Sequence, residues 1–228
     1  MFENVTKTYK KANNNLPEKI NSGAKTLAKN FGVEDRLNVM AKEQCFLTTK
    51  DHKKDFRVNP KYRLINPTKS ELGKISKQII QRINSELRPI LEVNQWQSTG
   101  SAINWFTKIP EKEVCAFTIF DIKEFYPSIT MDLLKKAIDF ACQHINILPK
   151  DKEIILHARK SLLYDKETPW VKRTGSPDFD VTMGSFDGAE VCELIGLYLL
   201  HQIGNKFNKK NVGLYRDDGL AVFKGLSQ

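Results

Sequence analysis

The tetrapeptide Arg216-Asp217-Asp218-Gly219 stands between two apolar runs near the C-terminal end of the sequence. An Asp-Gly turn between apolar runs is the strongest short-range pattern for a β-hairpin. Another apolar run, at 114–120, has the length of a buried strand and stops at Asp121. Strands of this kind pair side by side, and we therefore expect Asp121 to lie beside the hairpin tip with Asp217 and Asp218.

Three clustered carboxylates repel one another, and a fold tolerates them most easily when a divalent cation neutralises them. Oxygen ligands of this kind suit Mg²⁺ or Mn²⁺. Two such ions about 3.5–4 Å apart would clamp the attacking and leaving oxygens of a phosphoryl transfer. Taken singly, however, an Asp-Asp-Gly turn is more often an ordinary solvated turn, and an acid at a strand end is more often structural.

Hydrophobic periodicity predicts the rest of the chain as a mixture of helices and short strands. A hairpin around Trp170 is expected within the loop-rich stretch 165–181. A longer hairpin joins 45–49 to 62–65 through the charged loop 50–55. The expected helices cover 20–31, 34–42, 70–91, 131–145, 152–164 and 189–207, and the C-terminal hairpin joins 212–215 to 220–223.

Positive charge is concentrated in the first part of the chain. Residues 1–88 contain 19 Lys or Arg against 9 Asp or Glu, whereas residues 89–228 contain 17 against 18. Such a concentration favours binding to a polyanion, although a basic surface also serves solubility. The four scattered cysteines and four histidines show no disulfide or zinc spacing.

No membrane-spanning run and no secretory signal are found, so we expect an intracellular protein without membrane attachment. The cytoplasm and the nucleus are not distinguished by the sequence, and its oligomeric state is not indicated either.

Four stretches together resemble reverse transcriptases, in the order of that family and over residues 45–223. The sequence Asp-Ile-Lys-Glu-Phe-Tyr-Pro-Ser-Ile at 121–129 resembles the first palm motif, and Tyr-Arg-Asp-Asp at 215–218 resembles the YxDD motif. Met-Gly-Ser at 183–185, followed by a long helix, occupies the place of the glycine-containing motif between them. Lys50 and Arg63 stand where the fingers hairpin carries basic residues.

The resemblance implies roles for these residues. Asp121 and Asp217 would hold two catalytic ions, Mg²⁺ or Mn²⁺, with Asp218 beside them. Arg63 and Lys50 would contact the triphosphate of a dNTP, and Lys53 or Lys54 could replace Lys50. Two further residues would bind the substrate. Tyr126 would exclude a 2′-hydroxyl on the sugar, and Gly184 would allow close approach of the template or nucleotide.

The family's middle motif usually has Gln or a small polar residue where this chain has Phe186 and Asp187. An acid there is unexpected beside template phosphates. The alternative interpretation of Tyr126 is a core aromatic beside Phe125.

The predicted fold is α+β, with polymerase fingers, a partial palm, and an antiparallel palm sheet packed on helices. We divide the chain into a helical N-terminal region (1–44), a fingers-like region (45–113) and a palm (114–228), and the sequence after Asp218 leaves no room for a thumb. The function that the resemblance implies is that of a reverse transcriptase of the kind found in retroelements: template-directed DNA synthesis from an RNA template by two-metal nucleotidyl transfer. The expected partners are an RNA or DNA template with its primer, and dNTPs. The alternatives are an inactive, truncated nucleic-acid-binding remnant of a retroelement polymerase and, less favoured, an RNA-dependent RNA polymerase.

Overall fold

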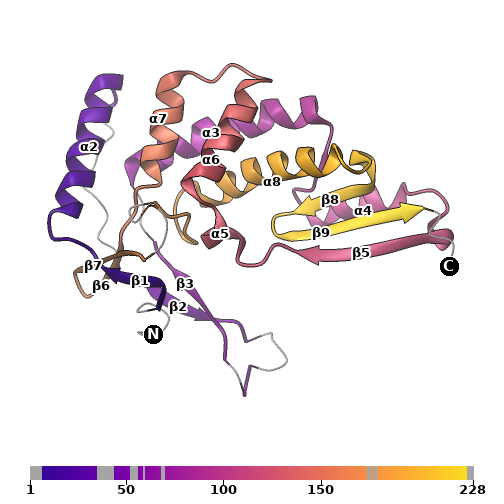
Figure 1. Cartoon of the computed structure of the whole chain (residues 1–228), viewed down its shortest axis with the longest axis horizontal. Coiled ribbons are helices and arrows are strands. Elements are labelled where there is room, and N and C mark those ends of the chain that lie inside the picture. Colours follow the sequence, from indigo (N-terminus) through magenta and orange to yellow (C-terminus); the bar gives the residue numbers. More distant parts are fainter. Residues whose placement is uncertain are drawn as a thin grey trace.

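The computed structural model of the protein describes residues 7–34, 44–51, 56–58, 60–67, 70–173, 176 and 179–224. Figure 1 shows a layer of helices above a sheet, with a separate hairpin that projects away from the helices. The helices are α2 (Leu16–Phe31), α3 (Glu71–Leu91), α4 (Thr99–Thr107), α5 (Phe125–Ser128), α6 (Met131–Cys142), α7 (Pro149–Ala158) and α8 (Gly188–Gly204). The strands are β1 (Tyr9–Lys11), β2 (Phe46–Thr49), β3 (Tyr62–Ile65), β4 (Asn94–Gln95), β5 (Cys115–Asp121), β6 (Leu163–Asp165), β7 (Thr168–Lys172), β8 (Val212–Tyr215) and β9 (Asp218–Lys224).

The helix α8 forms the centre of the main core because its side chains are apolar on almost every face. It packs against α3 and α6, and α7 packs against α3. Fully buried side chains from these helices, such as Ile83, Leu134, Ile155 and Leu194, form one cluster. Each buried side chain of this size contributes about 1.5–3 kcal/mol, which makes this cluster the main source of stability.

A four-stranded sheet with the strand order β4-β8-β9-β5 lies beneath α8. Its pairs β8–β9 and β9–β5 are antiparallel, as expected, whereas the two-residue strand β4 runs parallel to β8. Leu200 of α8 packs on Val212, Leu214 and Ala221 of the sheet. The α+β fold with a sheet packed on helices is therefore confirmed.

A second sheet, with the order β1-β7-β6, joins the N-terminal segment to the hairpin around Trp170. One of its faces packs on α2 through Tyr164 and Val171. The opposite face, with Tyr9 and Leu163, packs on Cys45 and Leu64 at the base of the β2–β3 hairpin. The three-residue strand β1 was not predicted, because so short a run has no periodicity.

Most of the predicted elements are present, but some boundaries were wrong. The helix expected at 152–164 ends at Ala158, and residues 163–165 form β6 instead. Leu163 and Tyr164 are buried in different clusters on opposite faces of the sheet, which only a strand allows.

Other boundaries differ by one turn or less. The helix α2 begins at Leu16, because Pro17 is well tolerated in a first turn, and α6 and α8 end three residues earlier than predicted. The helix expected at 34–42 lies outside the described residues, except for its first residue.

The helix α4 was not predicted, although a capping pattern marks its start. The Ser98 side chain accepts a hydrogen bond from the Ser101 backbone N–H, and the Ser101 hydroxyl bonds back to Ser98. The described part of the chain contains no helix with the length and apolar character needed to span a bilayer.

Candidate functional site

The two acidic motifs meet at one end of the β5–β9 pair. The strands pair in unbroken register from Cys115 opposite Lys224 to Asp121 opposite Asp218. Residues directly opposite each other in an antiparallel pair place their side chains on the same face. The Ile122 backbone N–H donates a 2.8 Å hydrogen bond to the Asp217 carbonyl, which ties the turn to the end of β5. The backbone thus places all three aspartates together, as the sequence predicts.

The turn between β8 and β9 consists of Arg216 and Asp217, one position earlier than the Asp-Gly pattern indicates. Arg216 has a left-handed φ of 57°, and Asp218 and Gly219 already belong to β9. Gly219 lies under the Phe120 ring, and a Cβ there would stand 2.1 Å from Phe120 Cζ. The glycine is therefore needed for packing between β5 and β9 rather than for the turn.

The three aspartates are exposed to solvent, and their carboxylate oxygens are the donors that Mg²⁺ and Mn²⁺ prefer. Among the described residues, however, no three acidic, His or Cys side chains converge closely enough to form a ready-made metal centre. The backbone positions and the donor chemistry fit a divalent cation.

Tyr126 lies on the short helix α5 beside this turn. Burial raises the pKa of Tyr126 to about 12, with smaller effects from the Cys192 thiol, Arg216 and Asp217. The same burial raises the pKa of Cys192 to about 12, and the thiol is hydrogen-bonded to Tyr126. Tyr126 is half-buried and packs at the edge of the main core, so the structure brings it to the aspartates and keeps its phenol neutral.

The two predicted basic residues lie on the β2–β3 hairpin. Arg63 stands opposite Thr48 in the register, and the Lys50 backbone N–H donates a 2.8 Å bond to the Lys61 carbonyl. Leu64 packs inward, so the neighbouring Arg63 is on the other face of the hairpin. Lys53 and Lys54 lie outside the described residues.

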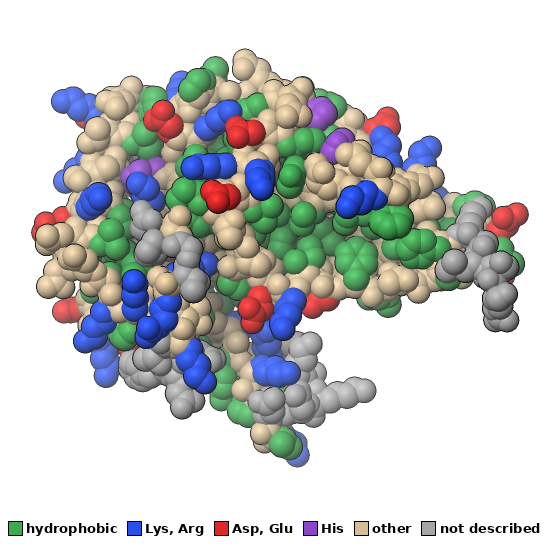
Figure 2. Space-filling model, in the orientation of Figure 1, with side chains coloured by type: hydrophobic (Ala, Val, Ile, Leu, Met, Phe, Trp, Pro, Cys, Tyr) green, Lys and Arg blue, Asp and Glu red, His purple; other side chains and the backbone are tan. Residues whose placement is uncertain are grey.

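Figure 2 shows a notch between this hairpin and the four-stranded sheet. Lys and Arg side chains lie along the notch, where acidic side chains are also present. The hairpin and the sheet therefore face each other across an open, charged space that can admit a ligand.

Gly184 lies in the loop before α8, where it approaches the end of β3. Its φ is 105°, and a Cβ would stand 2.8 Å from the Asn66 carbonyl oxygen. The close approach that the sequence indicated is therefore one to the chain's own backbone.

Asp187 is fully buried and has internal partners, which explains its presence in the middle motif. It forms an ion pair with Arg159, and the Ser76 hydroxyl donates a 2.6 Å hydrogen bond to it. Burial raises the pKa of Asp187, while Arg159 and Ser76 oppose that rise. Sequence reasoning missed Arg159 and Ser76, because neither residue belongs to a motif.

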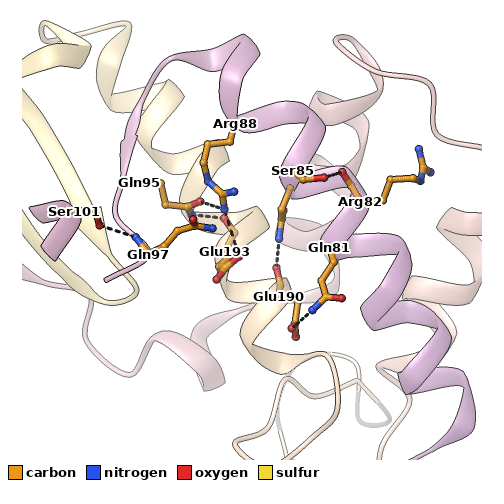
Figure 3. Close-up of polar contacts among 10 residues, drawn as sticks. Gln81, Arg82, Ser85, Arg88, Gln95, Gln97, Ser101, Glu190 and Glu193 are labelled. Atoms are coloured by element: carbon orange, nitrogen blue, oxygen red, sulfur yellow. Dashed lines mark hydrogen bonds and ion pairs between the residues drawn. The ribbon is translucent and has the colours of Figure 1, made fainter. Parts of the chain in front are cut away.

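Polar side chains also fix α8 against α3, as Figure 3 shows. Gln81 donates a 3.1 Å hydrogen bond to the Glu190 carboxylate. Asn84 Nδ2 donates a 3.0 Å hydrogen bond to the Glu190 carbonyl. Arg88 bonds to Gln95 at 3.3 Å and pairs with Glu193 at 3.5 Å. These contacts hold α8 against α3 and β4.

No protein-family model matches the sequence, and no curated protein matches it. Solved structures do match, and they share the fold of this chain at low sequence identity.

Structures of telomerase are among them. Apo telomerase from Candida tropicalis aligns with a TM-score of 0.58 at 11% identity, over 97% of this chain and 48% of that one. The same enzyme truncated from its C-terminal domain gives 0.53 at 14% identity, over 90% and 49%. Telomerase from Candida albicans in complex with a fragment of telomeric RNA gives 0.54 at 12% identity, over 89% and 42%. The chain thus spans less than half of these telomerases, and the likeness establishes the fold.

Proposed function

We propose that this chain carries the catalytic site of an RNA-directed DNA polymerase and extends the 3′-hydroxyl of a primer with dNTPs. One observation carries the proposal: the β5–β9 register places Asp121 opposite Asp218, and the Asp217 carbonyl accepts a hydrogen bond from the backbone N–H of Ile122, the residue after Asp121. Acidic motifs almost a hundred residues apart in the sequence meet at one exposed sheet end. A structural acid gains nothing from such an arrangement, because like charges repel.

Asp121, Asp217 and Asp218 would hold two divalent cations, Mg²⁺ or Mn²⁺. When bound, these ions would stabilise the charge that develops on the attacking and leaving oxygens during nucleotide transfer. The protein's own part is to present three carboxylates on a rigid sheet end, next to a notch that is open to solvent.

Arg63 and Lys50 would bind the triphosphate of the incoming nucleotide from the hairpin side of the notch. A guanidinium binds two phosphate oxygens at once, so Arg63 would fix the orientation of the triphosphate as well as its charge. Tyr126 would lie against the sugar, where its ring excludes a 2′-hydroxyl. Its neutral phenol avoids placing a negative charge beside the phosphates.

A primed RNA template fits the excess of positive charge in residues 1–88. The C. albicans telomerase matched above is itself described in complex with telomeric RNA. We propose a retroelement polymerase as the source of the chain, on the strength of its four motifs.

Primer extension on a primed RNA template with Mg²⁺ tests the proposal. The wild type is compared with Asp217→Asn and with Asp139→Asn, a matched change of an exposed aspartate on α6 that pairs only with Lys152 among the ion pairs of the described chain. We expect dNTP incorporation by the wild type and by Asp139→Asn. Asp217→Asn should lose at least about 100-fold in rate while it stays folded, since it removes a metal ligand and relieves repulsion.

Each other outcome points to a different function. A folded but inactive wild type that binds RNA in a salt-sensitive manner would indicate a nucleic-acid-binding remnant. Preference for NTPs over dNTPs would indicate an RNA-dependent RNA polymerase. Full activity of Asp217→Asn would overturn the assignment of the aspartates.

A further inference from the structure

The base of the β2–β3 hairpin is joined to the loop before α8 by a buried asparagine. The Asn66 backbone N–H donates a 2.9 Å hydrogen bond to the Met183 carbonyl. Its side-chain Nδ2 donates to the Leu162 carbonyl at 3.1 Å and to Ser161 Oγ at 3.4 Å. Asn66 is 1% exposed. One residue therefore connects the hairpin, the start of β6 and the loop before α8.

Gly184, in the loop before α8, lies in close contact with Asn66 and Ile65 at the base of the hairpin. A Cβ on Gly184 would stand 2.8 Å from the Asn66 carbonyl oxygen and 3.0 Å from Ile65 Cγ2. Both distances are shorter than an ordinary van der Waals contact, and the φ of 105° is one that a side chain disfavours. Because Gly184 has no side chain, the loop approaches the hairpin closely, and this contact fixes the distance between the two.

Two further contacts of the described part of the hairpin attach it to a different sheet. The Cys45 backbone N–H bonds to the Tyr164 carbonyl at 2.9 Å, and Leu64 packs on Tyr9 and Leu163. These contacts attach the hairpin to the β1-β7-β6 sheet, which carries none of the predicted site residues.

The contact of Asn66 with Met183, by contrast, connects the hairpin to the loop that lies next to Tyr126. The loop that it holds continues into Gly188 at the start of α8, where a Cβ would stand 3.6 Å from Tyr126 Cε1. Tyr126 in turn lies beside Asp217.

We propose that Asn66 is a positioning residue, which sets the hairpin that carries Arg63 at its working distance from the palm aspartates. The inference rests on the proposed function, because it assigns to Arg63 the triphosphate of the incoming nucleotide. Asn66 itself is buried and does not touch the substrate. Its effect passes through Arg63, which lies three residues earlier in the chain, on β3.

Steady-state kinetics of Asn66→Ala test this role. We expect the KM for dNTP to rise at least about fivefold with little change in kcat, because the hairpin then binds the triphosphate less well. Asn84→Ala is the matched control, since Asn84 is also buried and also donates through Nδ2 to a backbone carbonyl, but on α3. The control should leave the KM for dNTP unchanged. Asn66→Ser is a smaller change to use if Asn66→Ala does not fold.

A double-mutant cycle separates positioning from general support of the fold. In an Arg63→Ala background, Asn66→Ala should have almost no further effect on the KM for dNTP, because the group that it positions is gone. Full additivity of the two changes would overturn the proposal. An equal effect of Asn84→Ala would also overturn it.

Hydrogen exchange of the backbone amides gives a readout that does not require activity. Asn66→Ala should accelerate exchange in β2 and β3 and leave α3 and α8 protected. Unchanged exchange in the hairpin would overturn the proposal. A wild type that folds but incorporates no nucleotide would overturn the proposed function, and the exchange data would still decide whether Asn66 anchors the hairpin.

Discussion

Tyr126 combines two environments within one side chain. Its ring packs at the edge of the main core, and its hydroxyl is next to the Cys192 thiol and the turn that carries Asp217. A ring fixed on one side by a core cannot move aside for a bulkier ligand. This rigidity is what a residue that selects among sugars requires, and it also explains why Tyr126 can look like an ordinary core aromatic in the sequence.

Tyr126→Ala should admit ribonucleotides. Removing the ring opens the space that a 2′-hydroxyl needs, and the preference for dNTP over NTP should fall by roughly 10- to 100-fold. Competing incorporation of dNTP and NTP on the same template measures this preference. Tyr126→Phe keeps the ring and should keep the preference. Unchanged discrimination in Tyr126→Ala would mean that another residue contacts the sugar.

At the level of single elements, the pairing of β5 with β9 depends on a glycine. The Phe120 ring covers Gly219, and a Cβ at that position would lie 2.1–2.6 Å from three atoms of the ring. Overpacking of this kind forces the strands apart or the ring out of its rotamer. Because Asp218 precedes Gly219 on β9, any such shift also moves one of the site aspartates.

Gly219→Ala should destabilise the protein by about 1–3 kcal/mol, measured by chemical denaturation. Gly100→Ala on α4 is the control, because its nearest neighbour would be Ser98 Oγ at an ordinary 3.7 Å. That control should be neutral or slightly stabilising. Equal stability of the two variants would contradict the packing role of Gly219.

The start of α8 depends on a buried ion pair. Asp187→Ala would leave Arg159, which is 2% exposed, without its partner. Breaking a buried pair in this way costs about 3–5 kcal/mol. Asp139→Ala removes an exposed partner of Lys152 and should cost no more than about 1 kcal/mol. Denaturation of the two variants measures both values, and similar losses would contradict the structural role of Asp187.

Sequence patterns predicted the elements whose information is local. The hairpins at 46–65 and 212–224 and the helix α3 follow from apolar periodicity, and the Asp121 strand follows from its length. Contacts between distant segments have no local pattern. Arg159 meets Asp187 and Asn66 meets Gly184 only after folding, and Leu163 and Tyr164 form a strand only because β7 pairs with them.

At the scale of the whole molecule, the charge is unevenly distributed along the chain, and the more basic part contains the β2–β3 hairpin. Affinity for single-stranded RNA should therefore depend strongly on salt. We expect Kd to rise at least about tenfold between about 50 and about 200 mM salt, which corresponds to roughly two to three neutralised phosphates. Fluorescence anisotropy with a labelled RNA measures this dependence.

Neutralising Lys50 and Arg57 to Gln should weaken binding and reduce the salt dependence. The matched control neutralises Lys135 and Lys136 on α6, which are exposed but lie in the part of the chain without excess charge. Equal losses in both variants would contradict a binding surface at the hairpin.

We propose that the β5–β9 register builds a site for divalent cations from Asp121, Asp217 and Asp218. Electron paramagnetic resonance of Mn²⁺, titrated into the folded protein with primed RNA and dNTP, tests it most directly, because bound and free Mn²⁺ give different signals. We predict that the wild type and Asp139→Asn bind Mn²⁺ alike, and that Asp217→Asn binds it at least about tenfold more weakly. Equal Mn²⁺ binding by all three proteins would contradict the claim.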